Sequence, residues 1–226
     1  MDLPAASYFD RARLGRFVKR EYLPHFKVRT YGSGERILEC GFPVEALYFF
    51  VEGRVKVRIP AENGRDLLLC FYDPPQVFGD LELFQDERAA VTTVEAVTAC
   101  TCLALPRDFI GSRLAEDGQF LQELCRSLGR KLGRVIRNSA LNLLHPLDCR
   151  VASYILAVTP RPPEGPPAFS ANLSQAADLL GTTFRHLHRT LAALCGTGVL
   201  RKEGRTYVIV DGEALRAKAA GAYTLG

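Results

Sequence analysis

Long apolar runs are missing from this chain of 226 residues. No stretch approaches the ~20 consecutive apolar residues of a membrane-spanning helix, so the sequence predicts no contact with a membrane. The first residues also lack a basic segment followed by an apolar core, and we expect no signal peptide. The seven cysteines are an odd number and lie far apart, which favours free thiols in a reducing cytoplasm over a disulfide framework.

Side chains for covalent or acid–base catalysis are scarce as well. The four histidines are His25, His145, His186 and His188, and none lies beside a nucleophile signature. An enzyme that uses a Cys/His or carboxylate pair is therefore poorly supported, and we expect a protein that is not an enzyme.

Charge is distributed unevenly between the two halves of the chain. Residues 1–118 contain 15 Lys and Arg against 18 Asp and Glu, whereas residues 119–226 contain 14 against 7. An acidic first half and a basic second half suggest a sensing module joined to a module that binds a polyanion. Random drift of surface charge is the alternative.

The most informative segment is residues 173–194, which reads as two short helices that meet at Gly181. A glycine with positive φ suits the turn, and Ala177 is small where the helices would cross. Leucines at helical spacing form a buried stripe and leave arginine and histidine side chains outward. This pattern is typical of a helix-turn-helix that binds the DNA major groove, although any helical hairpin needs similar stripes.

A basic hairpin follows at once over residues 198–210. Two alternating runs flank a polar turn at Glu203 and Gly204, with Arg201, Lys202 and Arg205 around the tip. This arrangement predicts the wing of a winged helix-turn-helix.

Short β runs with glycine and proline between them occupy residues 30–105, after a short helix expected over residues 8–22. Expected strands cover residues 44–51, 54–59 and 67–72, with a tight turn at Glu62–Gly64 and two more strands within 89–104. The spacing predicts an antiparallel β roll (a double-stranded β-helix, cupin-like) and hence an α+β protein.

A long helix is expected from Gln119 to about Leu144. Two sets of positions recur every seven residues, which is typical of a coiled seam between two copies of the chain. Burial against the helix's own β domain is the alternative. The seam residues are Leu121, Cys125, Leu128, Leu132, Val135, Ser139 and Asn142.

His145 and Pro146 end this helix, because proline disfavours helical geometry in the residue before it. We expect a sensing domain over residues 1–118, a dimerisation helix and hinge over 119–145, and a DNA-binding domain over 146–226. A helix over 147–158 and a proline-rich loop over 160–167 would begin the last domain.

This order of elements resembles the CRP/FNR family of bacterial transcription regulators over nearly the whole chain. The matching segments are Gly34–Ile37, Gly41, Tyr48–Gly53, Phe78–Leu81, Arg88–Val91 and Leu173–Val210. The resemblance implies a homodimer that binds a palindromic operator in double-stranded DNA and contacts RNA polymerase.

In that family, the segment that matches residues 79–89 holds the phosphate and ribose of a cyclic nucleotide. The resemblance assigns an effector site to Gly79, Asp80, Leu81, Arg88, Ala89, Val135 and Ile136. Asp80 stands where cyclic-AMP binders carry glutamate, Ala89 replaces a serine, and Val135 and Ile136 cannot donate to a purine. We therefore expect another small effector or a redox signal, with a cyclic-nucleotide-responsive factor as the alternative.

Other cofactors of the family receive little support. Its iron–sulfur members need a tight cysteine group near the N-terminus, whereas the first cysteine here is Cys40. Cys100 and Cys102 share one face of a strand and suit apolar filling better than metal or redox chemistry. Haem ligation by His25 or His145 has no supporting pattern.

The family's base-reading positions match Phe184, Arg185 and Arg189. Each arginine can bind guanine O6 and N7 together, whereas Phe184 would touch a thymine methyl group or nothing. His186 suits either a base or a phosphate. Phosphate contacts are expected from Thr182, Thr183, Lys202 and Arg205. A ligand-regulated adaptor that does not bind DNA is the remaining alternative.

Overall fold

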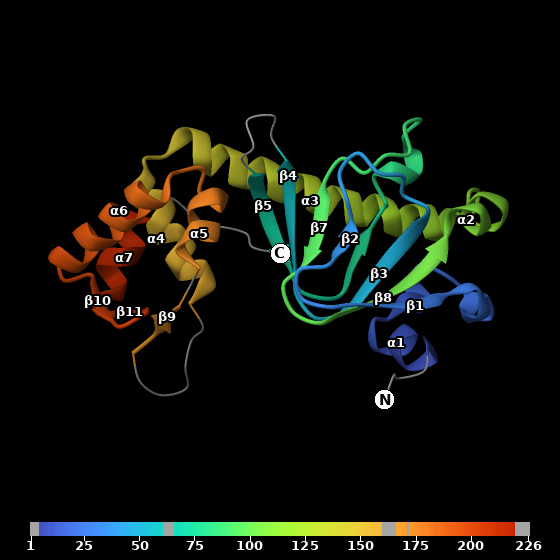
Figure 1. Ribbon diagram of the computed structural model, residues 1–226, viewed down its shortest axis with the longest axis horizontal. Helices are drawn as coiled ribbons and strands as arrows, with labels where there is room; N and C mark the ends of the chain where they lie inside the picture. Colours follow the sequence, from blue (N-terminus) through green and yellow to red (C-terminus); the bar gives the residue numbers. More distant parts are fainter. Residues whose placement is uncertain (1–4, 61–65, 160–165, 171, 220–226) are drawn as a thin grey trace. The chain divides into compact units, whose positions relative to one another are not determined.

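The computed structural model describes residues 5–60, 66–159, 166–170 and 172–219 (Figure 1). The expected turn at Glu62–Gly64 and most of the proline-rich loop lie outside these residues. The chain divides into two compact units, within residues 1–133 and within residues 134–225, and the boundary falls inside helix α3 (Gly118–Leu144).

The first unit contains two four-stranded sheets in which every paired neighbour is antiparallel. One sheet has the order β1-β8-β3-β6 and the other has the order β2-β7-β4-β5. Their strands are β1 (Lys27–Tyr31), β2 (Arg36–Leu38), β3 (Ala46–Glu52), β4 (Val55–Pro60), β5 (Asp66–Tyr72), β6 (Gln76–Phe78), β7 (Thr93–Ala96) and β8 (Cys100–Pro106).

Apolar cores cover both faces of the first sheet, which explains why strand β8 is buried almost throughout. Consecutive strand residues point to opposite faces. Phe49 accordingly packs with the helices, against Phe17 and Phe26, while Phe50 belongs to the core shared with the second sheet. The expected β roll and α+β class are confirmed.

The N-terminal segment differs from the single helix expected over residues 8–22. It forms helix α1 (Ala5–Arg11) and two 3₁₀ turns, η1 (Leu14–Arg16) and η2 (Arg20–His25). Arg13 adopts a left-handed φ of 52°, which ends regular helix at that point. Tyr8, Phe9 and other apolar side chains of this segment join the core beside Phe49.

Helix α3 ends at Leu144, and helix α4 (Leu147–Val158) begins after Pro146, whose ψ of 160° is extended. The break expected at His145 and Pro146 is therefore present.

Helix α2 (Arg107–Arg113) and the 3₁₀ turn η3 (Glu82–Phe84) complete the first unit. None of the helices within the described ranges has the length and apolar character to cross a membrane.

In its described residues, the second unit packs the end of α3 and helices α4 to α7 with a small antiparallel sheet of order β10-β11-β9 (Figure 1). Leu180, Leu187, Ile155 and Leu215 are among its fully buried side chains. The short strand β9, which pairs with β11, was not expected from the sequence. The remaining elements are β9 (Ala168–Phe169), α5 (Leu173–Leu179), α6 (Phe184–Gly196), β10 (Leu200–Glu203), β11 (Thr206–Ile209) and α7 (Gly212–Lys218).

Candidate nucleic-acid interface and effector segment

Helices α5 and α6 meet at a tight turn centred on Gly181. Its φ of 60° lies in the left-handed region, where glycine carries no Cβ penalty. The Thr182 amide donates to the Ala177 carbonyl at 2.9 Å and closes the turn. Ala177 is buried, as a close helix crossing requires. The helix-turn-helix predicted over residues 173–194 is present.

Helix α6 begins with a side-chain cap and is fixed by an apolar stripe. The Thr183 hydroxyl accepts from the His186 amide at 3.2 Å, which satisfies one free donor of the first turn. Thr183 itself is exposed. Leu187, Leu191 and Leu194 are buried and hold the opposite face against the second unit.

The exposed face of α6 carries cations and aromatic rings and has no carboxylate. Arg185, His186, His188 and Arg189 are all exposed, and Phe184 is 51% exposed. Phe184 stacks on His188, with ring centroids 6.1 Å apart and planes tilted by 24°. Polyanion binding suits this face, because nothing on the helix neutralises the guanidinium groups.

The wing follows as a two-residue hairpin. Strands β10 and β11 pair from Leu200 with Ile209 to Glu203 with Thr206, and Gly204 has a φ of 61°. Arg201 is paired to Glu203 at 2.8 Å, whereas Lys202 and Arg205 are exposed. The Lys202 ammonium lies 6.0 Å from the centroid of the Tyr207 ring on the neighbouring strand.

A groove of about 480 Å³ opens between α6, the wing and the start of α5. Phe184, Lys202 and Arg205 line it together with Asn172 and Ser174. Asn172 caps α5, accepting from the Ser174 and Gln175 amides at 3.1 and 3.3 Å. The groove therefore brings two wing cations next to the first residue of α6, which suits the track of a DNA backbone.

The predicted effector segment begins at Gly79, where the chain passes very close to strand β3. Its φ is 84°, and a Cβ at this position would lie 2.7 Å from the Ala46 carbonyl oxygen. Only glycine fits such an approach without displacement of the backbone. This turn delivers the next residue, Asp80, into the interior.

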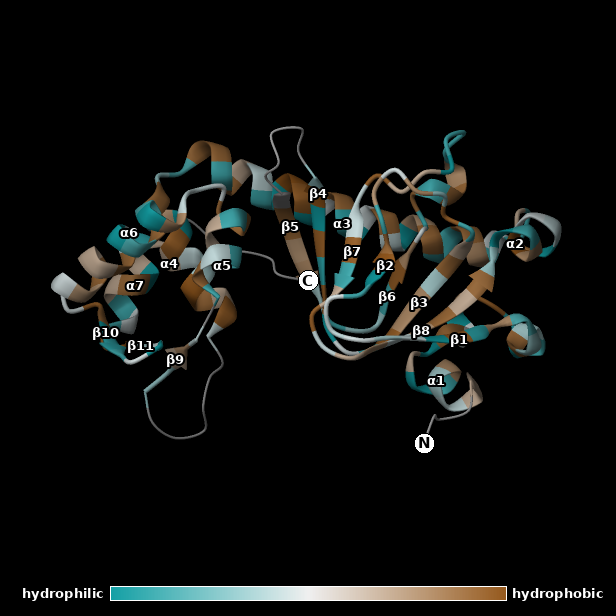
Figure 2. Cartoon of the chain, viewed as in Figure 1, coloured by the Kyte–Doolittle hydropathy of each residue, from teal (hydrophilic) through white to brown (hydrophobic). Residues whose placement is uncertain are grey.

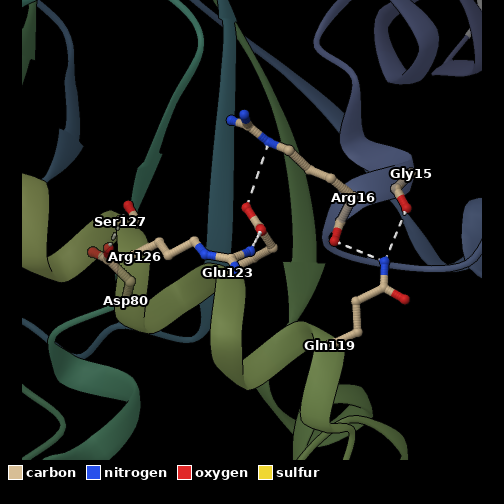
Figure 3. Close-up of polar contacts among 7 residues, drawn as sticks. All are labelled: Gly15, Arg16, Asp80, Gln119, Glu123, Arg126 and Ser127. Atoms are coloured by element: carbon tan, nitrogen blue, oxygen red, sulfur yellow. Dashed lines mark hydrogen bonds and ion pairs between the residues drawn. The ribbon is translucent and has the colours of Figure 1, made fainter.

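Asp80 is 2% exposed and is bound by side chains of α3. The Lys131 ammonium lies 2.6 and 2.8 Å from the two carboxylate oxygens, and the Ser127 hydroxyl donates to one of them at 3.3 Å. Lys131 also lies over the Phe78 ring at 5.7 Å. Figure 3 shows Asp80 beside Ser127, and Arg16 and Arg126 on either side of Glu123. Asp80 therefore connects the β roll to helix α3 of the same chain through an ion pair and a hydrogen bond.

A second buried carboxylate, Glu82, lies in the same segment and was missed by the sequence analysis. Glu82 is 3% exposed, and its Oε1 accepts from the Val91 amide at 3.1 Å. Arg107 donates to the Glu82 and Leu83 carbonyls at 2.8 and 3.2 Å, which fixes the turn. The sequence did contain a signal for this residue, because an acidic side chain is unexpected in a segment that would hold a phosphate.

The other predicted effector residues have different surroundings. Arg88 is exposed, and its carbonyl accepts from the Val44 amide at 2.8 Å. Ala89 forms a β-bridge with Pro43, and Leu81 is 42% exposed. Val135 and Ile136 belong to the second unit and are exposed.

The polar groups of this segment are bound to partners within the chain. A phosphate needs free amide donors and a cation, but the Val91 amide is already bound by the Glu82 carboxylate. That carboxylate would repel a second anion. A ribose hydroxyl would compete with Lys131 and Ser127 for Asp80.

Helix α3 has two stripes of different character, and Figure 2 shows hydrophobic and hydrophilic residues alternating along it. Its buried side chains include Phe120, Leu124, Ser127, Arg134, Asn138 and Leu141. The predicted seam lies one position further along the sequence than this buried stripe. Four of its members, Cys125, Leu132, Val135 and Ser139, are exposed, while Leu121, Leu128 and Asn142 are half-buried. Packing inside the first unit thus uses the neighbouring stripe, with Phe120 and Leu124 in its core.

Asn142, expected in the seam, has a partner within its own unit. Its side-chain amide donates to the Leu179 carbonyl at 3.3 Å, and the Arg150 guanidinium donates to the adjacent Leu180 carbonyl. These two carbonyls end helix α5, so both side chains anchor the turn of the helix-turn-helix.

The cysteines show no clustered site within the described part of the chain, where no group of three metal-ligating side chains occurs. Burial raises the pKa of the Cys100 and Cys102 thiols, which keeps them protonated and unreactive. Of the histidines considered for haem, His25 stacks on Phe109, with ring centroids 4.2 Å apart.

Two known domain families match this chain. Residues 28–117 match the cyclic nucleotide-binding domain, and residues 149–218 match the Crp-like helix-turn-helix domain. Regulatory protein YeiL of Escherichia coli O157:H7 is 32% identical over 195 residues, covering 86% of this chain and 84% of that protein.

Two further proteins are similar to this chain. The CRP-like cAMP-activated global transcriptional regulator of Mycobacterium tuberculosis is 28% identical, over 84% of this chain and 86% of its own length. The crystal structure of TTHB099, a CRP-family transcriptional regulator from Thermus thermophilus, has a TM-score of 0.72 and 25% identity, covering 88% of this chain and all of that one.

Proposed function

The chain belongs to the CRP/FNR family of transcription regulators, and on this premise we propose that it acts as a homodimer that reads a palindromic DNA operator. The observation that carries the proposal is the exposed face of α6, with Arg185 and Arg189 free of any carboxylate on the same helix. Each guanidinium matches the two acceptors of guanine in the major groove. Arg185, His186 and Arg189 contact bases in this proposal.

The phosphate contacts come from the residues around the groove beside α6. Thr182 and Thr183 lie at the start of the helix, and Lys202 and Arg205 extend from the wing. Contacts of this kind orient the protein on the duplex without reading its sequence. They make binding strongly dependent on salt, because each neutralised phosphate releases a counterion.

Dimerisation uses the exposed stripe of α3. Leu132, Val135 and Ile136 are 61, 44 and 58% exposed, an apolar surface that a second copy of the helix would cover. A two-fold pair would present its recognition helices to major grooves about 34 Å apart, which corresponds to half-sites one turn of DNA apart. The protein then contacts RNA polymerase from the operator, as a cytoplasmic regulator.

The β roll acts as the sensor, and its signal is a small molecule other than a cyclic nucleotide or a change in redox state. The second candidate is a cyclic-nucleotide-responsive factor. It is favoured by the match to the cyclic nucleotide-binding domain and by a relative described as cAMP-activated. We prefer the first, because Glu82 fills the phosphate-holding segment with a carboxylate.

In vitro selection from random duplexes, followed by binding measurements, tests the proposal. We expect a palindromic consensus and an affinity that falls steeply with salt. Enrichment of no sequence, or binding that salt does not weaken, would contradict DNA recognition and support the adaptor alternative.

Light scattering during size-exclusion chromatography tests the dimer separately. Leu132→Glu places a charge in the seam and is expected to give a monomer. Arg137→Glu is the matched control, because Arg137 is exposed and lies about 140° around the helix from Leu132. A dimer that survives Leu132→Glu would refute this interface.

A further inference from the structure

The exposed surface of α6 contains one large apolar side chain, Phe184. Phe184 is the first residue of the helix and is 51% exposed, although it lies on the same side of α6 as the buried Leu187 and Leu191. Within α6, all of which the structure describes, no other large apolar side chain is exposed. The ring lines the groove beside α6 together with the wing cations, so a ligand bound there can contact it.

Phe184 forms an aromatic ridge with His188, one helical turn further along. Their rings lie 6.1 Å apart and nearly parallel. Residues four apart are neighbours on a helix surface, so Arg185 and Arg189 form a second, cationic ridge displaced by one residue. The helix therefore presents two adjacent ridges with different chemistry.

The aromatic ridge also borders the groove that contains the wing cations. Phe184 lines this groove with Lys202 and Arg205. A DNA strand whose phosphates contact the wing cations in this groove would pass close to the phenyl ring. The apolar contact is thus directed to the edge of a base near the backbone track.

We propose that Phe184, supported by His188, selects a thymine in each half-site through its 5-methyl group; this inference rests on the proposed operator binding. Thymine is the one base that presents a methyl group in the major groove. The phenyl ring has no donor or acceptor and so cannot recognise guanine, adenine or cytosine by hydrogen bonds. Thymine also presents the O4 acceptor beside its methyl group, and an imidazole N–H of His188 can donate to such an acceptor.

Replacement of single thymines by deoxyuridine in the selected operator tests this directly, because it removes only the methyl group. For the wild-type protein we expect one position per half-site at which the replacement weakens binding about fourfold, the effect of one buried methyl group. Phe184→Ala should bind the thymine and deoxyuridine operators equally, and Phe184→Leu should retain part of the discrimination.

Two controls separate the possible failures. Arg185→Ala should weaken binding to both operators while preserving their ratio, and circular dichroism should show that Phe184→Ala remains folded. Equal binding of thymine and deoxyuridine operators by the wild-type protein, or discrimination that persists in Phe184→Ala, would overturn the inference. Selection that enriches no operator would instead refute the proposed function, and this inference with it.

Discussion

The Lys131 ammonium lies 2.6 Å from Oδ1 of Asp80, a carboxylate that is 2% exposed. This pair links α3 to the loop that follows strand β6, within the first unit. Ser127, one turn earlier on the same helix, donates to the other carboxylate oxygen. Asp80, which the resemblance assigns to the effector site, is thus already bound by two side chains of α3.

Lys131→Met is expected to destabilise the first unit strongly. It leaves the Asp80 carboxylate buried without its cation, and the loss of one partner from a buried ion pair costs about 3–5 kcal/mol. Urea unfolding followed by far-ultraviolet circular dichroism measures the change. The double variant Lys131→Met/Asp80→Asn should recover much of the stability, whereas a single variant as stable as wild type would show that the pair contributes nothing.

Arg150→Met is expected to destabilise the helix-turn-helix and weaken operator binding. The Arg150 guanidinium donates to the Leu180 carbonyl, beside the Leu179 carbonyl that Asn142 holds at 3.3 Å. Hydrogen bonds to charged groups contribute about 1.5–3 kcal/mol. Thermal unfolding and operator titration measure the two effects, with the dimer checked by light scattering.

Arg216→Met is the matched control for Arg150, because Arg216 is an exposed arginine of α7 in the same unit. It should leave both measurements unchanged. If the two variants had the same thermal stability and the same operator affinity, the anchoring role of Arg150 would be refuted.

Stability is expected to fall as pH rises above about 9. Burial raises the pKa of Cys102 in the folded protein above its ordinary value of 9.0. Above that pH the unfolded thiol releases its proton while the folded thiol keeps it, so rising pH favours unfolding by up to about 1.4 kcal/mol per pH unit for each such group. Burial raises the pKa of Tyr31 and Tyr48 too, and they add to the effect at higher pH.

Urea midpoints measured between about pH 8 and pH 10 follow this loss of stability. Cys102→Ala should reduce the slope with pH, because it removes the buried thiol. A slope that Cys102→Ala leaves unaltered would contradict the assignment.

Calorimetric titration with cyclic AMP and cyclic GMP is expected to give no saturable heat at millimolar concentration. The Glu82 carboxylate, 3% exposed, already binds the Val91 amide and would repel a phosphate in this segment. A cAMP-activated relative serves as the positive control. Binding of one nucleotide per protomer would overturn our interpretation of the β roll.

Much of this fold could be predicted from local sequence patterns. The recognition helix was predictable because Leu187, Leu191 and Leu194 recur at helical spacing after a glycine that must turn. The break after Leu144 was predictable because Pro146 constrains the residue before it.

Relationships between distant residues could not be predicted in the same way. Lys131 lies in a run of basic residues, and nothing local distinguishes it as the partner of Asp80, 51 residues away. Glu82 looks like any acidic surface residue until the fold buries it beside Val91. The buried stripe of helix α3 contains Ser127, Arg134 and Asn138 beside Phe120 and Leu124, so nothing local in the sequence distinguishes it as the side that packs inside.

The most direct test of the account is the affinity of Arg189→Ala for the selected operator, measured by fluorescence anisotropy beside a scrambled duplex. Each lost guanine contact removes about 1–3 kcal/mol of discrimination, and a palindrome loses two. We predict that the variant remains a dimer and binds the operator about as weakly as the scrambled duplex. Unchanged affinity for the operator would contradict the claim that α6 reads the DNA.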